Sequence, residues 1–195
     1  VAKKMGLPIN KIIIATNSND ILSKFFQTGV YKVSKVVPTL SPSMDIQVAS
    51  NFERLLFEYL DFKPALVTEY MTKLNTHGFF KISKKILCEL NKTFIGVSVN
   101  DDKTIKCIRS CYSEKNIIID PHTSVGLEAA YSTNLEELCI VLSTAHPVKF
   151  SSAVNMAINN TPSLPNKYKS IFTLKEKYQS IPNDLNEIKK FISIN

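Results

Sequence analysis

Several common sequence signatures are missing from this chain. No continuous apolar run approaches the roughly 20 residues that a membrane-spanning helix requires, which predicts a soluble globular domain without a membrane partner. Glycine is scarce, and the five glycines stand far apart in the sequence. A P-loop, a dinucleotide-binding fingerprint and a GxSxG nucleophile elbow each need closely spaced glycines, so all three are excluded.

Metal-binding patterns are missing too. The three histidines form no HExxH pair, and among the four cysteines only Cys107 and Cys111 are close together, at the i, i+4 spacing of a helix. No second pair of ligands accompanies them in the sequence. We therefore expect reduced cysteines, no metal site and a cytoplasmic location.

The charge is strongly basic but dispersed. The net charge is +7, from 24 lysines and arginines against 17 aspartates and glutamates. Nucleic-acid binding would require these cations to cluster beside exposed aromatic side chains. They are instead spread along the chain, as at Lys32, Lys63, Lys92, Lys149 and Lys169. The sequence indicates a solvated basic surface and no nucleic-acid partner.

The first residues carry neither an initiator methionine nor the apolar segment of a signal peptide. A helix-like pattern begins directly at residues 1–5. We interpret the chain as a piece cut from a longer protein.

Short β-branched apolar runs predict strands, and apolar residues at three- and four-residue spacing predict helices. Strands are expected at residues 11–15, 33–37, 93–99, 116–119 and 138–142. Helices are expected from a cap at Asn19 or Asp20 to Gly29, and from Asp45 or Ser50 to Leu60, with Ser50 or Asn51 as the candidate N-cap of the second. Further helices are expected over residues 64–75 and 82–91, from a cap at Asp101 or Asp102 to residue 111, and over 149–159 and 183–194. The prolines within residues 38–43 predict an irregular loop there.

Strands that alternate with helices are typical of a parallel sheet covered on both faces. We predict an α/β fold with three αβα layers and a mostly parallel sheet, in a main domain over residues 1–160 that is followed by a helical extension over residues 161–195. Ligands bind such sheets at the carboxyl ends of the strands. Polar loops at residues 16–20, 120–124 and 143–147 follow three predicted strands, which makes them the expected ligand site.

The residues alone leave two interpretations of these loops open. Ser143, His146 and Asp120 could form a hydrolase triad, because loops at neighbouring strand ends bring such side chains together. His146, which precedes a proline, could equally be a capping or buried hydrogen-bonded residue. Taken by itself, the pattern supports an α/β ligand-binding domain.

A resemblance carries the interpretation further. Six segments in order, AKKMGLPI at 2–9, ATNSND at 15–20, TLSPSMDI at 39–46, SNFERLL at 50–56, DPHTSVG at 120–126 and STAHPVKF at 143–150, resemble the threonine synthases of the bacterial and fungal branch. Their order and spacing are more specific than any single motif. The intervening segments and the last forty or so residues match only loosely.

The resemblance implies the C-terminal part of a fold-type-II pyridoxal-phosphate (PLP) enzyme, similar to the tryptophan synthase beta subunit. Threonine synthases convert O-phospho-L-homoserine and water to L-threonine and phosphate by a β,γ-replacement, with PLP as cofactor. Two other functions remain open. One is a non-catalytic remnant or interaction module of the same fold, and the other is a related phospho-lyase that eliminates phosphate without adding water.

The resemblance also implies roles for individual residues. Thr144 is similar to the hydroxyl that contacts the pyridine nitrogen of PLP, with a simple loop-capping role as the alternative. Asp120 and His122 would lie at the strand end beside the cofactor ring, and His146 would lie near it. The segment with Ser50, Asn51 and Arg54 resembles the substrate-binding segment, where a helix N-terminus and a guanidinium group suit a phosphate or carboxylate. Arg54 alternatively only solvates its helix face.

One expected feature has no counterpart in these residues. The family's cofactor lysine lies in a motif like Ser-Phe-Lys-Asp, and the PLP phosphate rests in a loop rich in glycine and asparagine. The cofactor lysine and the phosphate-binding loop are both expected upstream of Val1, and no lysine of this chain replaces the cofactor lysine. We therefore expect no catalytic residue in this chain, an inactive isolated chain, and the missing N-terminal half as its partner.

Overall fold

The structure is a computed structural model, and it describes residues 1–194. The chain forms two compact units, Val1–Pro162 and Ser163–Asn195, and each is described by itself. No helix within residues 1–194 is both long and apolar enough to cross a membrane.

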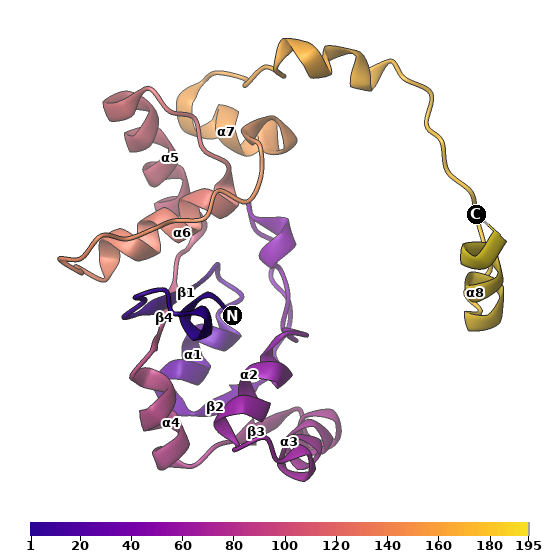
Figure 1. Cartoon of the computed structure of the whole chain (residues 1–195). Helices are drawn as coiled ribbons and strands as arrows, with labels where there is room; N and C mark the ends of the chain where they lie inside the picture. The colour runs from indigo at the N-terminus through magenta and orange to yellow at the C-terminus, as the bar shows by residue number, and fades with distance from the viewer. Residues whose placement is uncertain (195) are drawn as a thin grey trace. The chain divides into compact units, whose positions relative to one another are not determined.

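The elements of both units are labelled in Figure 1 where there is room. The first unit contains, in chain order, η1 (Ala2–Met5), β1 (Ile12–Thr16), α1 (Ile21–Thr28), β2 (Val30–Lys32), η2 (Pro42–Met44), α2 (Phe52–Tyr59), α3 (Pro64–His77), β3 (Phe79–Lys81), α4 (Lys84–Asn91), β4 (Phe94–Ser98), α5 (Asp101–Lys115), α6 (Pro121–Ser132), η3 (Pro147–Phe150) and α7 (Ser151–Ile158). The second unit contains η4 (Asn166–Phe172) and α8 (Leu185–Ile194).

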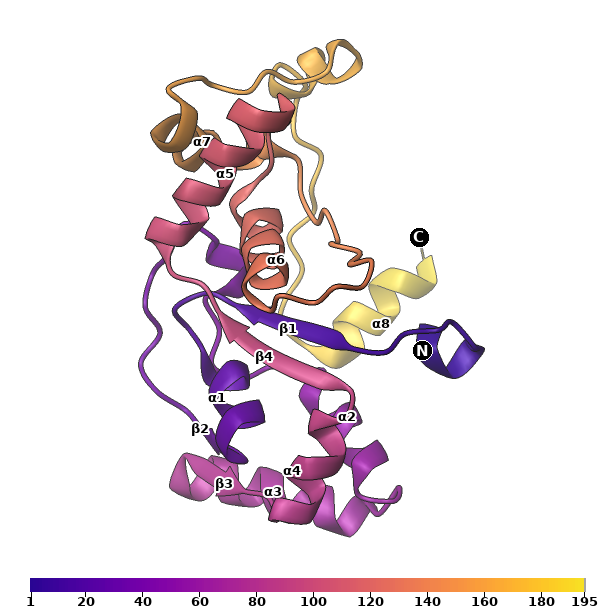
Figure 2. The same cartoon turned by 90° about the vertical axis from the view of Figure 1, so that its left-hand side faces the viewer.

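The centre of the first unit is a parallel pair of strands, β1 and β4, that run side by side in Figure 2. Their register aligns Ile12 with Phe94 and Thr16 with Ser98. Successive side chains point to opposite faces, so Ile14 packs toward α1, whereas Ile13 packs toward α6. One helix therefore covers each face of the strand pair (Figure 2). This arrangement confirms the predicted α/β fold.

The larger hydrophobic core lies on the α1 side and is rich in aromatic rings. Phe25 is fully buried and meets Phe52 edge-on, with 4.7 Å between ring centroids. Tyr31 on β2 stacks on Phe80 on β3 at 5.2 Å, within the short antiparallel pair formed by these strands. Aromatic pairs of this kind stabilise a core beyond the area that they bury. The core anchors the segment that connects β1 to β4.

The predicted end of α1 at Gly29 is confirmed, whereas α3 continues two residues past its predicted end at residue 75, to His77. Gly29 ends α1 with φ 73°, and Gly78 ends α3 with φ 75°. Both angles lie in the left-handed region that only glycine adopts without strain.

Two predicted helix caps differ from the structure in detail. Asp20 is the N-cap residue of α1, as predicted, but its side chain makes no capping hydrogen bond and instead pairs with Lys24 at 2.9 Å. Asn100, and not the aspartates after it, caps α5 by accepting from the N–H of Lys103 at 3.0 Å. An asparagine oxygen satisfies a free N–H of the first turn as well as a carboxylate does, so sequence alone did not separate the candidates.

Three predicted strands do not form within residues 1–194, namely those at 33–37, 116–119 and 138–142. A β-branched run becomes a strand only beside a partner strand with free N–H and C=O groups, and none pairs with residues 116–119 or 138–142 in this part of the protein. In the segment at 33–37, Val33 donates to the C=O of Gly78 at 2.9 Å, but both backbone groups of Val37 bond to the Asn19 side chain instead of to a strand. The apolar side chains of Leu138, Ile140 and Leu142 are 94, 76 and 75% exposed. The parallel sheet is therefore narrower than the sequence predicted.

Candidate functional site

The loop after β1 is held by a buried asparagine. Asn17 donates from its side-chain amide to the hydroxyl of Thr39 at 2.7 Å and to Oδ1 of Asp45 at 2.8 Å. Its Oδ1 accepts from the backbone N–H of Asn19 at 2.8 Å. Because Asn17 is only 1% exposed, these bonds replace the water that its amide loses on burial.

The neighbouring asparagine clamps the far side of the same loop. Asn19 donates to the C=O of Val37 and accepts from the N–H of Val37, both at 2.8 Å. It also donates to Oδ1 of Asp45 at 3.0 Å, while Oδ2 of Asp45 accepts from the N–H of Thr39 at 2.9 Å. The proline-containing loop over residues 37–45 is thus fixed to the carboxyl end of β1.

We expect replacement of Asn17 by alanine to loosen this loop. The change leaves buried donors and acceptors unpaired, which costs about 1–3 kcal/mol. Chymotryptic cleavage of the chain after Leu40 or Met44 should then become about 5- to 150-fold faster, because cleavage follows the population of the open loop. Asn155→Ala, at an exposed position on α7, is the matched control and should leave the rate unchanged. Equal rates for the two variants would contradict the proposed clamp.

A second corner of the site is built around Asp120, which is fully buried at the start of α6. Its Oδ1 accepts from the backbone N–H and from Nδ1–H of His122, each at 2.9 Å, and its Oδ2 accepts from the Thr123 hydroxyl. Since Nδ1 of His122 donates to the carboxylate, Nε2 is the acceptor, and it receives the backbone N–H of Ser43 at 3.3 Å. The Asp120 corner is thereby tied to the loop over residues 37–45.

The third predicted loop, at residues 143–147, joins the same corner. The N–H of Thr144 donates to Oγ1 of Thr123 at 3.4 Å, and the ring of Phe150 lies 4.5 Å from the ring of His122. Thr144 is exposed, and its hydroxyl makes no hydrogen bond within residues 1–194. The structure therefore brings Asp120, His122 and Thr144 close together through Thr123, and leaves the hydroxyl of Thr144 available for a ligand.

The hydrolase triad is excluded. Oδ1 and Oδ2 of Asp120 are engaged by His122 and Thr123, and His146 is exposed, with its Nδ1 accepting from the N–H of Val148 at 3.3 Å. No hydrogen bond in the described part of the chain joins His146 to Asp120 or to Ser143. His146 caps η3, which is one of the roles that the sequence left open.

The predicted substrate segment lies at the start of α2. Ser50, Asn51 and Arg54 are all exposed, and the Arg54 guanidinium donates to the side-chain oxygen of Asn51. Asn51 is the N-cap residue but makes no side-chain capping bond. None of the hydrogen bonds described for residues 1–194 links this segment to the Asp120 corner, so its role stays a prediction.

The cysteines take no part in the site. All four are unpaired, and burial raises the pKa of the Cys107 thiol, which keeps it protonated and unreactive at neutral pH. Over residues 1–194, no three histidine, cysteine, aspartate or glutamate side chains gather into a metal-binding group.

Sequence reasoning missed the residues that hold the site together. Asn17, Asp45 and Thr123 lie in the quoted segments but were not assigned roles. Two asparagines directly after a buried strand, followed by a proline-rich loop that ends in an aspartate, are a usable signal. Such side chains bond to backbone groups of irregular loops.

The fold and its polar loops together define a class of protein. An α/β unit with fixed polar loops and a free hydroxyl at the carboxyl end of its parallel strands is a ligand-binding domain of the open-sheet type.

Comparisons with known proteins identify the family. Residues 123–192 match the family described as "Threonine synthase, C-terminal". The chain is 42% identical over 206 residues to the threonine synthase of Saccharomyces cerevisiae, covering 92% of this chain and 40% of that protein. It is 37% identical over 196 residues to that of Pseudomonas aeruginosa, covering 99% of this chain and 42% of that protein.

Solved structures agree with the sequence matches. The crystal structure of PLP-bound threonine synthase from Brucella melitensis superposes with a TM-score of 0.86 at 39% identity, over 98% of this chain and 41% of that one. The chain belongs to the threonine synthase family and corresponds to its C-terminal portion. It spans about two fifths of the length of the curated relatives that it matches.

Proposed function

We propose that this chain forms the C-terminal part of a threonine synthase, which converts O-phospho-L-homoserine and water to L-threonine and phosphate with PLP as cofactor. The observation that carries the proposal is the free hydroxyl of Thr144, held beside the buried Asp120 corner at the carboxyl end of the parallel strands. Relatives named threonine synthase match nearly the whole chain and include a PLP-bound structure.

The chemistry of the site fits PLP. The pyridine nitrogen of the cofactor can accept a hydrogen bond from a neutral hydroxyl, and the exposed Thr144 has one without a protein partner in residues 1–194. When bound, PLP supplies the electron sink for removing protons from the substrate. Thr144 would hold the ring nitrogen, and Thr123 would keep Thr144 in place through the Thr144 N–H.

The other predicted cofactor residues would act in different ways. Asp120 is fully buried and its oxygens are engaged, so it would orient His122 and Thr123 without touching the ring itself. His146 is exposed at the same loop, and its Nε2 would be available to the cofactor or substrate.

The substrate phosphate or carboxylate would bind at the start of α2. Arg54 supplies a planar guanidinium that can make two parallel hydrogen bonds to either group. Its hydrogen bond with Asn51 limits the rotamers of the guanidinium, and Ser50 adds an exposed hydroxyl in the same turn.

The rest of the enzyme would be supplied by the N-terminal part of the same protein. That part would carry the cofactor lysine, residues 1–160 would complete the PLP-binding domain, and residues 161–195 would form a helical extension. We also propose a cytoplasmic location, since four unpaired cysteines suit a reducing compartment.

A fused protein tests this function directly. It consists of the part of Pseudomonas aeruginosa threonine synthase that precedes the matched region, followed by residues 1–195 of this chain. With PLP and O-phosphohomoserine, it should release threonine and phosphate in equal amounts. Accumulation of 2-oxobutanoate would instead identify a phospho-lyase, and a folded fused protein without turnover would leave a non-catalytic module. The unmodified Pseudomonas protein is the control.

Thr144→Val in the fused protein should weaken both PLP binding and turnover. Loss of one neutral hydrogen bond is worth about 0.5–1.5 kcal/mol, so kcat/KM should fall about 2- to 10-fold. The dissociation constant for PLP, measured by absorbance titration, should rise by a similar factor. Thr144→Ser, which keeps the hydroxyl, should retain both the kcat/KM and the dissociation constant of the unmodified fused protein. Thr161→Val, at an exposed position, is the matched control. Unchanged PLP binding in Thr144→Val would leave this threonine with a loop-capping role only.

A further inference from the structure

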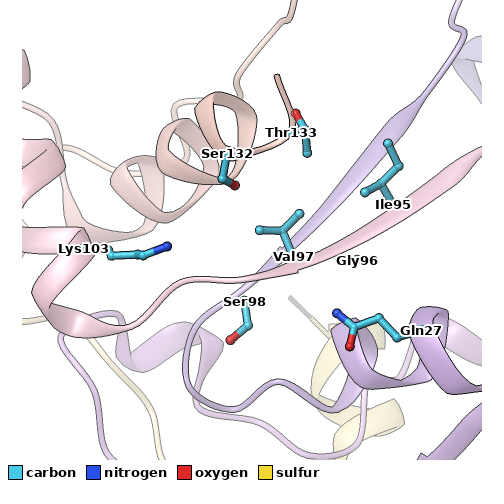
Figure 3. Close-up of a pocket in the computed structure, with 8 residues that line it drawn as sticks. All are labelled: Gln27, Ile95, Gly96, Val97, Ser98, Lys103, Ser132 and Thr133. Atoms are coloured by element: carbon cyan, nitrogen blue, oxygen red, sulfur yellow. The ribbon is translucent and has the colours of Figure 1, made fainter. Parts of the chain in front are cut away.

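Arg54 carries a positive charge that no carboxylate of the described residues neutralises. Its guanidinium donates to the side-chain oxygen of Asn51, and none of the ion pairs within residues 1–194 includes it. The cation in the groove of about 510 Å³ shown in Figure 3 differs in this respect. Lys103 is the charged residue among the eight that line the groove, and its Nζ lies 3.9 Å from Oε1 of Glu128. Arg54 is therefore the better cation for an anionic ligand.

Glu58 is the acidic residue that could neutralise Arg54. It follows Arg54 by four residues on α2, and side chains at this spacing meet on one face of a helix. Glu53, the other acidic residue of α2, is adjacent to Arg54 in the sequence and therefore lies on a different face. Opposite charges four residues apart attract each other, so a free Glu58 carboxylate would compete with a substrate anion for the guanidinium.

Lys4 removes the Glu58 carboxylate from this competition. The Nζ of Lys4 lies 3.0 Å from Oε2 of Glu58 and 5.6 Å from the centroid of the Phe62 ring. The second contact is a cation–π interaction, because the face of an aromatic ring attracts a positive charge. Two partners, one on α2 and one on the turn after it, thus hold the ammonium group of Lys4 in place.

The turn after α2 has an unfavourable backbone conformation that places the Phe62 ring beside Lys4. Asp61 and Phe62 have φ 54° and 58°, in the left-handed region that residues other than glycine rarely adopt. The N–H of Phe62 donates to the C=O of Phe57 at 2.9 Å, and the two rings meet edge-on with 5.4 Å between their centroids. Strained backbone that its surroundings hold in place is concentrated at functional sites.

We propose that Lys4 is a positioning residue that keeps Arg54 available for the anionic group of the substrate. Lys4 pairs with the Glu58 carboxylate, and the guanidinium of Arg54 therefore stays free of an acidic partner. The inference rests on the proposed function for the role of Arg54. It deepens that function, because it adds a residue from outside the substrate segment that determines the charge of this segment.

Steady-state kinetics of the fused protein test the role of Lys4. Lys4→Met removes the charge and keeps a flexible apolar side chain. The side chains of Lys4 and Glu58 are 59 and 41% exposed, so their pairing is weak, and KM for O-phosphohomoserine should rise about 2- to 5-fold with kcat unchanged. Adding Glu58→Gln to Lys4→Met should restore the original KM, because the competing charge is gone. Lys4→Arg, which keeps the positive charge, should retain the original KM.

Lys3→Met is the matched control. It removes the same charge from the neighbouring residue, whose Nζ donates to the C=O of Ile9 at 2.8 Å and not to Glu58. This variant should leave KM unchanged. An unchanged KM in Lys4→Met would overturn the proposal, and so would a raised KM that Glu58→Gln does not restore. A general loss of structure is recognised because a second substitution at Glu58 would not reverse it.

Two further measurements separate this proposal from the proposed function. If the unmodified fused protein forms no threonine, the proposed function fails. The dissociation constant for O-phosphohomoserine, measured by calorimetry on the same variants, then takes the place of KM. With Arg54→Met already present, Lys4→Met should have little further effect on either constant. A full effect in that background would show that Lys4 acts on another group and would contradict the proposal.

Discussion

Replacement of Asp120 by alanine is expected to lower the free energy of unfolding of the fused protein by about 2–4 kcal/mol. The carboxylate accepts three hydrogen bonds in a site without solvent access, from the N–H and ring of His122 and from the hydroxyl of Thr123. Alanine leaves these donors buried without partners and removes the N-cap of α6. Denaturant unfolding followed by circular dichroism measures the loss.

The same change should also reduce activity, because two loops depend on this corner. His122 holds the loop over residues 37–45 through Ser43, and Thr123 holds Thr144. Asp184→Ala is a suitable control, since Asp184 likewise accepts from two backbone N–H groups, of Asn186 and Glu187, but is exposed. It should leave the unfolding midpoint nearly unchanged. A similar unfolding midpoint for the two variants would show that the buried hydrogen bonds of Asp120 contribute little to the stability of the fold.

Replacement of Gly96 by alanine should destabilise the fused protein by about 1–3 kcal/mol or more. The new Cβ would lie 2.8 Å from Cα and 2.9 Å from the carbonyl oxygen of Ser23, and neither atom can move without shifting α1. The packing of α1 on β4 must therefore open. Thermal unfolding measures the effect as a lower unfolding midpoint. The backbone amides of β4 should at the same time exchange their hydrogens with solvent faster.

The matched control uses the same substitution in another tight position. A Cβ on Gly126 would meet only the Val141 side chain, at 3.3 Å, and a side-chain end can move. Alanine also favours the helical conformation over glycine by roughly 0.5–1 kcal/mol. Gly126→Ala should therefore be neutral or slightly stabilising. If both variants were equally destabilised, the close contact at Ser23 could not be the cause.

The sequence predicted the layers of the fold better than the extent of its sheet. The apolar run at residues 11–15 and the amphipathic pattern after it correctly placed β1 and α1, because both signals are local. The run at residues 138–142 is also apolar, but the side chains of Leu138, Ile140 and Leu142 are exposed and the run has no partner strand within residues 1–194. Whether such a run pairs depends on a partner strand, which no local pattern describes.

The sequence likewise predicted some features of the candidate site and not others. The strand-end argument grouped the loops that contain Asp120 and Thr144, and the N–H of Thr144 does donate to Thr123 beside Asp120. The strands on which that argument rested, at residues 116–119 and 138–142, do not form within residues 1–194. It did not predict the bond from Ser43 to His122, because that contact depends on the path of a proline-rich loop. The substrate segment at Arg54 rests on resemblance, and only turnover by the fused protein can test it.

The long sequence separation of the two paired strands has a consequence for synthesis on the ribosome. β1 pairs with β4, and about 80 residues, including α1 to α4, lie between them in the chain. At roughly 5–20 residues per second, β1 leaves the ribosome about 4 to 16 seconds before β4 is made. During that interval the run of isoleucines in β1 is an unpaired, aggregation-prone strand. If the proposed N-terminal part precedes this chain and folds first, it would shield this strand until β4 is made.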